Sequence, residues 1–153
     1  MTDTPDLAAL RADPRVAIAR DVLRFSDCDA LGHVNNVVYA TMCESGRVTY
    51  LRERLPPAER AGERAGERAD LAFVIVKLEI AFEAELHYPG AVETATWLSR
   101  LGRTSFTLSQ AIHAGERRAA TAEGVCVAID ATTRKPVAFE GQTRAAMERL
   151  VIG

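Results

Sequence analysis

Arg24-Phe-Ser-Asp-Cys-Asp-Ala-Leu-Gly-His-Val-Asn-Asn-Val-Val-Tyr39 is the stretch of sequence on which the interpretation of the fold depends. Ten consecutive residues in it contain two carboxylates, a thiol, an imidazole and two amides: Asp27, Cys28, Asp29, His33, Asn35 and Asn36. Asp, Gly and Asn favour turns, because their side chains bond to nearby backbone groups or tolerate left-handed geometry. An apolar run with helical spacing follows. The stretch therefore predicts a polar loop leading into a helix N-terminus, which suits an anion or a developing oxyanion.

One long helix is predicted from Asn35 or Asn36, either of which is a suitable N-cap, to Leu55, where Pro56-Pro57 stops it. Residues at spacings of three and four give it one buried face: Tyr39, Met42, Cys43, Gly46 and Tyr50. Three further residues widen the apolar surface, as a helix wrapped by a sheet requires: Val38, Ala40 and Val48. Glycine inside a helix costs about 1 kcal/mol relative to alanine, and a close approach to a strand backbone would explain Gly46.

Strands are predicted on both sides of this helix from β-branched residues and alternation. One precedes it, and four follow: Val16–Phe25, then Leu71–Phe82, Val92–Leu101, Thr104–His113 and Arg117–Asp130. In the first of the four, the even-numbered residues from Val74 to Phe82 are expected on one face and the odd-numbered ones from Phe73 to Ala81 on the other. The breaks between the last three strands are short and imply an antiparallel meander.

The remaining segments are expected to be peripheral. Residues 1–14 read as a loose tail or a short helix around Leu7–Arg11. Residues 141–153 are expected to carry a short terminal helix, Thr143–Ile152. The repeated Ala-Gly-Glu-Arg in Glu59–Asp70 indicates a solvated connection, with a lid over a ligand as the second interpretation.

Length and composition indicate a single ordinary domain. The 153 residues are 48% hydrophobic and 26% charged, with a net charge of −2, so nothing suggests a nucleic-acid surface. Three widely spaced cysteines without a zinc pattern are typical of reduced thiols in a cytosolic protein. We expect no signal peptide, because the N-terminus has no apolar core, and no membrane span, because no apolar run is long enough.

The motif Asp29-Ala-Leu-Gly-His33-Val-Asn-Asn36-Val-Val-Tyr39 resembles the signature of hotdog-fold thioesterases of the 4-hydroxybenzoyl-CoA and acyl-CoA thioesterase group. Glu44-Ser-Gly-Arg47 also resembles the Glu-x-x-Arg of that family's helix, and a weaker likeness continues to about Pro136. The resemblance implies an α+β hotdog fold, in which a curved antiparallel sheet of about five strands wraps a long central helix. It further implies a homodimer or homotetramer with active sites at the subunit interface.

The resemblance implies that Asp29 is the catalytic carboxylate and that His33 assists it. A thioester is hydrolysed either by water that a base activates or by direct attack of a carboxylate, and the sequence leaves both open. The resemblance also implies that Asn36 shapes the loop and that Tyr39 lines the acyl pocket. The residues alone favour structural roles instead: Asp29 as an Asx-turn or capping residue, Asn36 as an N-cap and Tyr39 as a core residue of the helix.

Arg103 and Ser105, at a strand turn, are candidates for binding coenzyme A, and Arg134-Lys135 in a later turn is a second basic candidate. Ordinary solvent-facing charge is the alternative for each. Cys28 reads as a packing residue, and Asp27, Asp29 and His33 are only a weak metal pattern. No metal or cofactor is expected.

The expected function is that of a cytoplasmic acyl-CoA thioesterase, with the backbone N–H groups at the helix start as the oxyanion site. The alternatives are a hotdog protein that only binds an acyl thioester or serves as a scaffold, and a thioesterase acting on acyl carrier protein. The sequence does not specify the acyl group. It predicts neither a nucleic-acid nor a membrane partner.

Overall fold

The computed structural model describes residues 4–55 and 71–153. Its elements are, in chain order, α1 (Leu7–Ala12), β1 (Ala17–Val22), the 3₁₀ turn η1 (Phe25–Asp27), α2 (Asn36–Glu53), β2 (Leu71–Phe82), β3 (Ala91–Leu101), β4 (Ser105–Ala114), β5 (Arg117–Asp130) and α3 (Gly141–Glu148). The predicted order of one strand, one long helix and four strands is confirmed. The connection expected at Glu59–Asp70, with its possible lid, lies outside the described residues.

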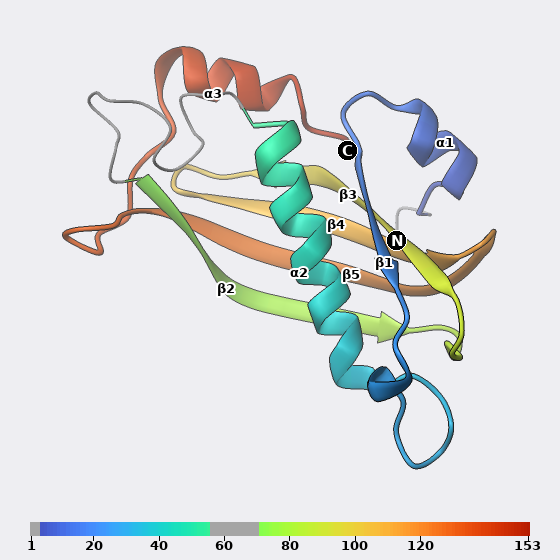
Figure 1. The fold of residues 1–153 in the computed structure, drawn as a ribbon. Coiled ribbons are helices and arrows are strands. Elements are labelled where there is room, and N and C mark those ends of the chain that lie inside the picture. The colour runs from blue at the N-terminus through green and yellow to red at the C-terminus, as the bar shows by residue number, and fades with distance from the viewer. Residues whose placement is uncertain (1–3, 56–70) are drawn as a thin grey trace.

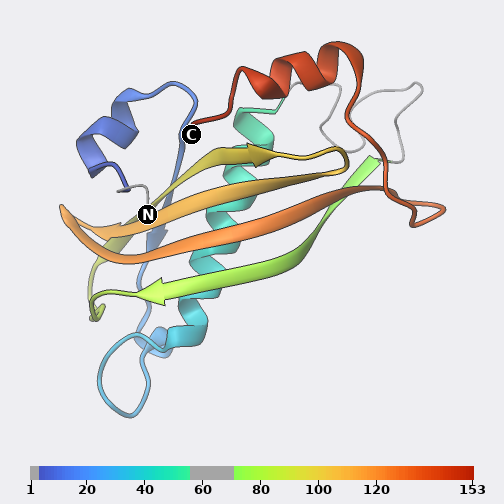
Figure 2. The same cartoon turned by 180° about the vertical axis from the view of Figure 1, so that it is seen from behind.

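The five strands form one antiparallel sheet in the order β1-β3-β4-β5-β2. The sheet is curved, and α2 crosses one of its faces (Figure 1). Seen from behind, the strands lie in front of α2 (Figure 2). The α+β class and the long helix against a curved five-stranded sheet are therefore as predicted, with β1 and β2 as the two edges of the sheet.

Helix α2 buries the face that its spacing predicts: Tyr39, Met42, Cys43, Gly46 and Tyr50. Towards its start this face packs with Val92 and Ile112, and towards its end with Leu98 and Phe106. Val48, which was expected to widen the buried surface, is 48% exposed. Within residues 4–55 and 71–153, this side of α2 is therefore left uncovered.

The close approach predicted at Gly46 exists, but it involves side chains of β3 and β4 instead of a strand backbone. A Cβ atom at Gly46 would lie 2.6 Å from both Gln110 Nε2 and Thr96 Oγ1. The Gln110 amide donates hydrogen bonds of 2.9 Å to the Cys43 carbonyl and to Thr96 Oγ1. Gly46 thus leaves room for the bonds that tie the middle of α2 to the sheet.

The predicted faces of β2 are wrong on one side of an irregularity in the strand. The register of β2 against β5 shifts between Ile75 and Lys77. An extra residue in one strand reverses the alternation beyond it. Phe73 consequently packs into the core on one side of the shift, while Leu78 and Ile80 pack into it on the other.

The ends of the chain pack on this framework. Of the two alternatives for the N-terminus, the structure has the helix: Asp6 caps α1 by accepting the Ala9 N–H at 2.8 Å, and Leu10 packs beside Ala95 and Trp97 on the sheet face opposite α2. Strand β1 is shorter than predicted because the chain enters η1 soon after Val22. Helix α3 lies a little earlier than predicted, and the chain behind it bridges to β3.

Candidate active site

The motif loop is a tight reversal between β1 and α2. A bridge between Cys28 and Val34 closes it. Inside it, the Asp29 N–H donates to the His33 carbonyl at 3.0 Å, and the Gly32 N–H donates to the Asp29 carbonyl at 3.1 Å. Gly32 has a φ of +84°, a left-handed conformation that glycine adopts without cost. The loop therefore brings the ends of the Asp29–His33 segment together.

Asp29 and His33, the two predicted catalytic residues, face each other in this loop. Asp29 Oδ2 lies 3.9 Å from His33 Nδ1, and both side chains are about a quarter exposed. The other carboxylate oxygen, Oδ1, accepts the Leu31 N–H at 2.9 Å. Asp29 therefore forms the Asx-turn that the residues alone suggest, yet it keeps one oxygen beside His33.

The start of α2 is fixed by Asp27 and Asn35. The Asp27 carboxylate accepts the Arg24 N–H at 2.8 Å, and its carbonyl accepts the Asn35 N–H at 2.8 Å. Asn35 is the N-cap: its Oδ1 accepts the Val37 N–H at 3.1 Å and its carbonyl accepts the Val38 N–H at 2.9 Å. Asp27 thus has a structural role that accounts for its place in the motif.

Asn36 and Tyr39, the predicted substrate-binding residues of the motif, differ in their surroundings. Asn36 is the first residue of α2 and is exposed. Tyr39 is buried; its hydroxyl donates to the Ala84 carbonyl at 3.1 Å, and its ring meets Phe82 edge-to-face at 5.1 Å. Burial raises the pKa of Tyr39. These contacts are those of a core tyrosine, and its role in an acyl pocket stays a prediction.

Two residues that the sequence did not single out lie against the motif loop. The segment after β2 places Glu85 Oε1 3.8 Å from His33 Nε2, and Glu85 Oε2 lies 3.4 Å from His87 Nε2. The only signal for them in the sequence is the placement of two polar side chains two residues apart after a strand. That spacing puts them on one side of an extended chain, but it does not say what they face.

Arg103 and Ser105 lie at the other end of the sheet from Asp29. The motif loop leaves the sheet at the end where β3 begins, because the Leu23 N–H, just after β1, donates to the Gly90 carbonyl, just before β3. Arg103 follows the far end of β3, where its carbonyl accepts the Phe139 N–H. Arg134 lies in the turn after β5, which is also at the far end. A strand of this length spans on the order of 30 Å, so one chain does not bring these residues to Asp29.

Two of the three thiols are poorly suited to act as nucleophiles. Cys43 and Cys126 are buried, and burial raises the pKa of each to about 11. Cys28 is partly exposed and packs against the cluster beneath the loop. Among residues 4–55 and 71–153, no three His, Cys, Asp or Glu side chains are grouped as metal ligands. Within the same parts of the chain, no helix is long and apolar enough to cross a membrane.

A groove runs between α2 and the edge strand β2, close to the helix start. It has a volume of about 450 Å³. Its helix side carries Val37, Glu44 and Arg47, and its strand side is formed by residues 75–78. Because β2 is an edge strand, the groove opens at the rim of the sheet. Val37 of the motif lines it, so this groove adjoins the motif.

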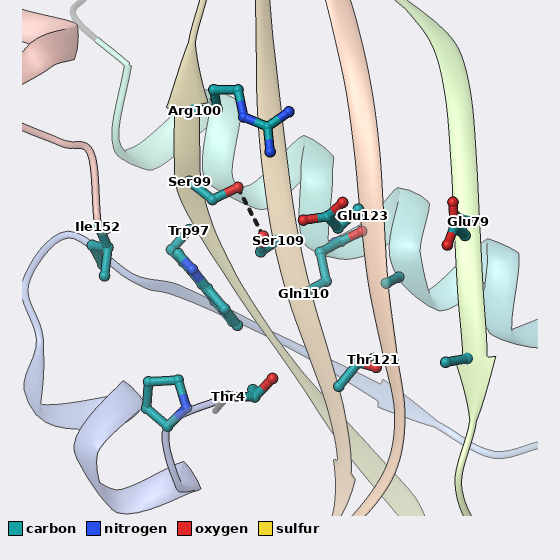
Figure 3. Close-up of a pocket in the computed structure, with 14 residues that line it drawn as sticks. Thr4, Glu79, Trp97, Ser99, Arg100, Ser109, Gln110, Thr121, Glu123 and Ile152 are labelled. Atoms are coloured by element: carbon teal, nitrogen blue, oxygen red, sulfur yellow. Dashed lines mark hydrogen bonds between the residues drawn. The ribbon is translucent and has the colours of Figure 1, made fainter. Parts of the chain in front are cut away.

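A larger cavity of about 610 Å³ lies on the sheet face opposite α2. Figure 3 shows Trp97, Ser109 and Glu123 projecting into it from three neighbouring strands. Ser109 Oγ donates to Ser99 Oγ at 2.8 Å across its floor. No residue of the motif loop lines this cavity, so we do not assign it to the predicted chemistry.

Comparison with known proteins identifies the family and the fold of the chain. Residues 23–147 match the model of the thioesterase-like superfamily. YbaW from Escherichia coli, described as a probable thioesterase, is 26% identical, with a TM-score of 0.70 over 89% of this chain and 99% of that one. A probable thioesterase from Bartonella henselae is also 26% identical, with a TM-score of 0.66 over 82% and 98% of the two chains.

A DHNA-CoA thioesterase from Staphylococcus aureus has the same fold, with a TM-score of 0.73 over 88% of this chain and 89% of that one, at 19% identity. No curated protein sequence matches the chain. The family match covers the motif loop, α2 and the whole of β2 to β5. The protein therefore has the hotdog fold and belongs to the thioesterase-like superfamily.

Proposed function

We propose that the protein hydrolyses an acyl-CoA thioester to a free acid and coenzyme A. The observation that carries this proposal is the Asp29–His33 pair at the start of α2, in a member of the thioesterase-like superfamily. Asp29 acts as the general base for water or as the nucleophile. Because Oδ1 is held by the Leu31 N–H, Oδ2 is the oxygen that we assign to this role, with His33 assisting it.

The oxyanion of the tetrahedral intermediate is assigned to the start of α2. Hydrogen bonds within the loop and cap use the N–H groups of Asn35, Val37 and Val38. The Asn36 N–H is the first-turn donor outside this set, so we assign it to the oxyanion. A single donor of this kind lowers the barrier by about 3–4 kcal/mol.

The groove between α2 and β2 is our proposed acyl site. Its walls combine Val37 and Ala40 with the exposed edge residues Ile75 and Val76. We propose that a second copy of the chain pairs with this edge and completes the site. When two β2 edges pair antiparallel, the far end of one sheet lies beside the motif end of the other. Arg103 and Ser105 would then serve the coenzyme of the opposite subunit.

A thiol-release assay with short, medium, long and aromatic acyl-CoAs tests this function and gives the acyl class. Asp29→Asn should lower kcat about 10²- to 10⁴-fold on the best substrate. Asp27→Asn is the matched control, because it makes the same change in the same loop at a residue whose bonds are to the backbone. Full activity of Asp29→Asn, with its fold intact, would show that the assigned role is wrong.

A protein that binds an acyl thioester without cleaving it is the second candidate. The Asx-turn bond from Leu31 to Asp29 favours it, since this bond accounts for Asp29 without catalysis. Saturable binding of acyl-CoA with no thiol release would support it. Turnover only with acyl carrier protein would instead change the substrate.

The three unpaired cysteines support a place in the reducing cytoplasm.

A further inference from the structure

The carboxylate of Glu85 lies between two imidazoles beside the motif loop. Its Oε1 is 3.8 Å from His33 Nε2, and its Oε2 is 3.4 Å from His87 Nε2. The two imidazole rings meet edge-to-face, with centroids 6.2 Å apart. The other nitrogen of His33, Nδ1, faces Asp29 Oδ2 at 3.9 Å. Each nitrogen of His33 therefore faces a carboxylate, one from its own loop and one from the segment after β2.

The backbone around Glu85 is held firmly, although its side chain is largely exposed. The Val34 N–H donates to the Leu86 carbonyl at 2.8 Å, which joins the segment to the motif loop. Arg117 Nη2 donates to the Glu85 carbonyl at 2.8 Å. Leu86 itself is buried in the same cluster as Val34. The position of Glu85 next to His33 is thus set by the fold on both sides.

We propose that Glu85 is a positioning residue for His33 in the thioester hydrolysis proposed above. Turning an imidazole by 180° exchanges each nitrogen with a carbon, so the partners of the two nitrogens decide which orientation is favoured. Carboxylates beside both nitrogens select the orientation in which Nδ1 faces Asp29. A third group that orients the assisting side chain is a general feature of activated catalytic pairs.

Glu85 is expected to affect catalysis and to contribute little to folding. Exposed ion pairs contribute little to stability, and Glu85→Gln keeps the size of the side chain and the backbone bond to Arg117. We therefore expect Glu85→Gln to fold normally. Its kcat should fall about tenfold with little change in KM, the size of effect seen for coupled neighbours.

A double-mutant cycle separates positioning of His33 from a general effect of charge. It uses Glu85→Gln, His33→Gln and the double variant on the best acyl-CoA. The loss from Glu85→Gln should disappear when His33 is already absent. Glu83→Gln is the matched control, because Glu83 lies on the same segment but pairs with Arg118 at 2.8 Å, and it should keep wild-type kcat. Wild-type kcat for Glu85→Gln, or an equal loss in the His33→Gln background, would overturn the proposal.

A second measurement does not depend on activity. Nitrogen-15 spectra of the imidazoles should show changed His33 signals in Glu85→Gln and unchanged ones in Glu83→Gln. Unchanged His33 signals in Glu85→Gln would overturn the positioning role whatever the kinetics. If Glu85→Gln changes the His33 signals but the wild-type protein cleaves no thioester, the contact between Glu85 and His33 is confirmed and the proposed function is contradicted.

Discussion

Gly46 sits where α2 crosses β3 and β4, and it has no room for a side chain. A methyl group there would lie 2.6 Å from Gln110 Nε2 and Thr96 Oγ1. We expect Gly46→Ala to lower the free energy of unfolding by about 1–3 kcal/mol through overpacking, although alanine favours helices. Urea unfolding measures this. Gly124→Ala is the control, since the nearest atom to its Cβ would be 3.5 Å away. Unchanged stability of Gly46→Ala would show that α2 can shift away from the sheet.

His113 gives the protein a pH dependence of stability. It is buried, and its Nδ1 has no hydrogen-bond partner among the described residues. Burial is the main cause that lowers the pKa of His113, and the positive charges of Arg118 and Arg11 lower it further. A hydrogen bond with the Ala111 backbone and the negative charge of Glu116 act in the opposite direction. The folded pKa therefore lies below the unfolded value of about 6.5. As the pH falls below that value, the unfolded chain binds the proton first, and stability is lost until the pH passes the folded pKa.

Urea unfolding of the wild type and His113→Gln, at about pH 7.5 and about pH 5.5, measures this effect. The wild type should lose more stability between the two conditions than the variant, whatever their difference at the higher pH. An equal loss in both proteins would assign the pH dependence to other groups.

The sequence could pair Asp29 with His33, because they are four residues apart in a motif with a known family pattern. It could not add Glu85, because that contact depends on the Val34–Leu86 hydrogen bond between distant segments. Local chemistry by itself favours a turn role for Asp29, and only the family pattern indicates a catalytic one. The structure contains the turn bond and the contact with His33 at once.

At the scale of an element, the start of α2 allows a test of the oxyanion donor. Proline fits the first helical position, where it removes one N–H without breaking the helix. The preceding residue, Asn35, has φ −59° and ψ 137°, a conformation that residues before proline favour. We expect Asn36→Pro to fold normally and to lose about 10²- to 10³-fold in kcat, because it lacks the donor assigned to the oxyanion.

Asn36→Ala is the companion variant, since it removes the side chain but keeps the N–H. It should retain most of the activity if the backbone group is the donor. Equal losses in the two variants would assign the effect to the amide side chain, and no loss in Asn36→Pro would place the oxyanion elsewhere.

Elements with a regular period could be predicted more fully than irregular ones. The buried face of α2 follows from its spacing, since an uninterrupted helix keeps its period. Strand β2 could be predicted in its bounds but not in its faces, because the shift between Ile75 and Lys77 is set by pairing with β5. The sequence of one strand does not determine the register in which it pairs with its neighbour.

At the scale of the whole molecule, the edge strand β2 is left open by the part of the chain that the structure describes, which motivates the proposed dimer. Ile75, Val76 and Phe82 on β2 are exposed, as is Val37 on the neighbouring turn of α2. An unpaired, apolar edge strand is a ready template for pairing with another chain, and grouped apolar exposure marks interaction sites. A dimer through β2 would cover this edge and close the groove beside α2.

We expect Val76→Lys to abolish this dimer, because a charge without a partner would be buried at the centre of the paired edges. Sedimentation velocity should give a dimer for the wild type and a folded monomer for the variant, with thiol release lost because the groove is left open. Val22→Lys makes the same change at an exposed valine on the opposite edge, β1, and should remain a dimer. A monomeric wild type that cleaves acyl-CoA would mean that one chain holds a complete site. A dimeric Val76→Lys would place the interface elsewhere, and Arg103 and Ser105 would then not lie near Asp29 of the opposite subunit.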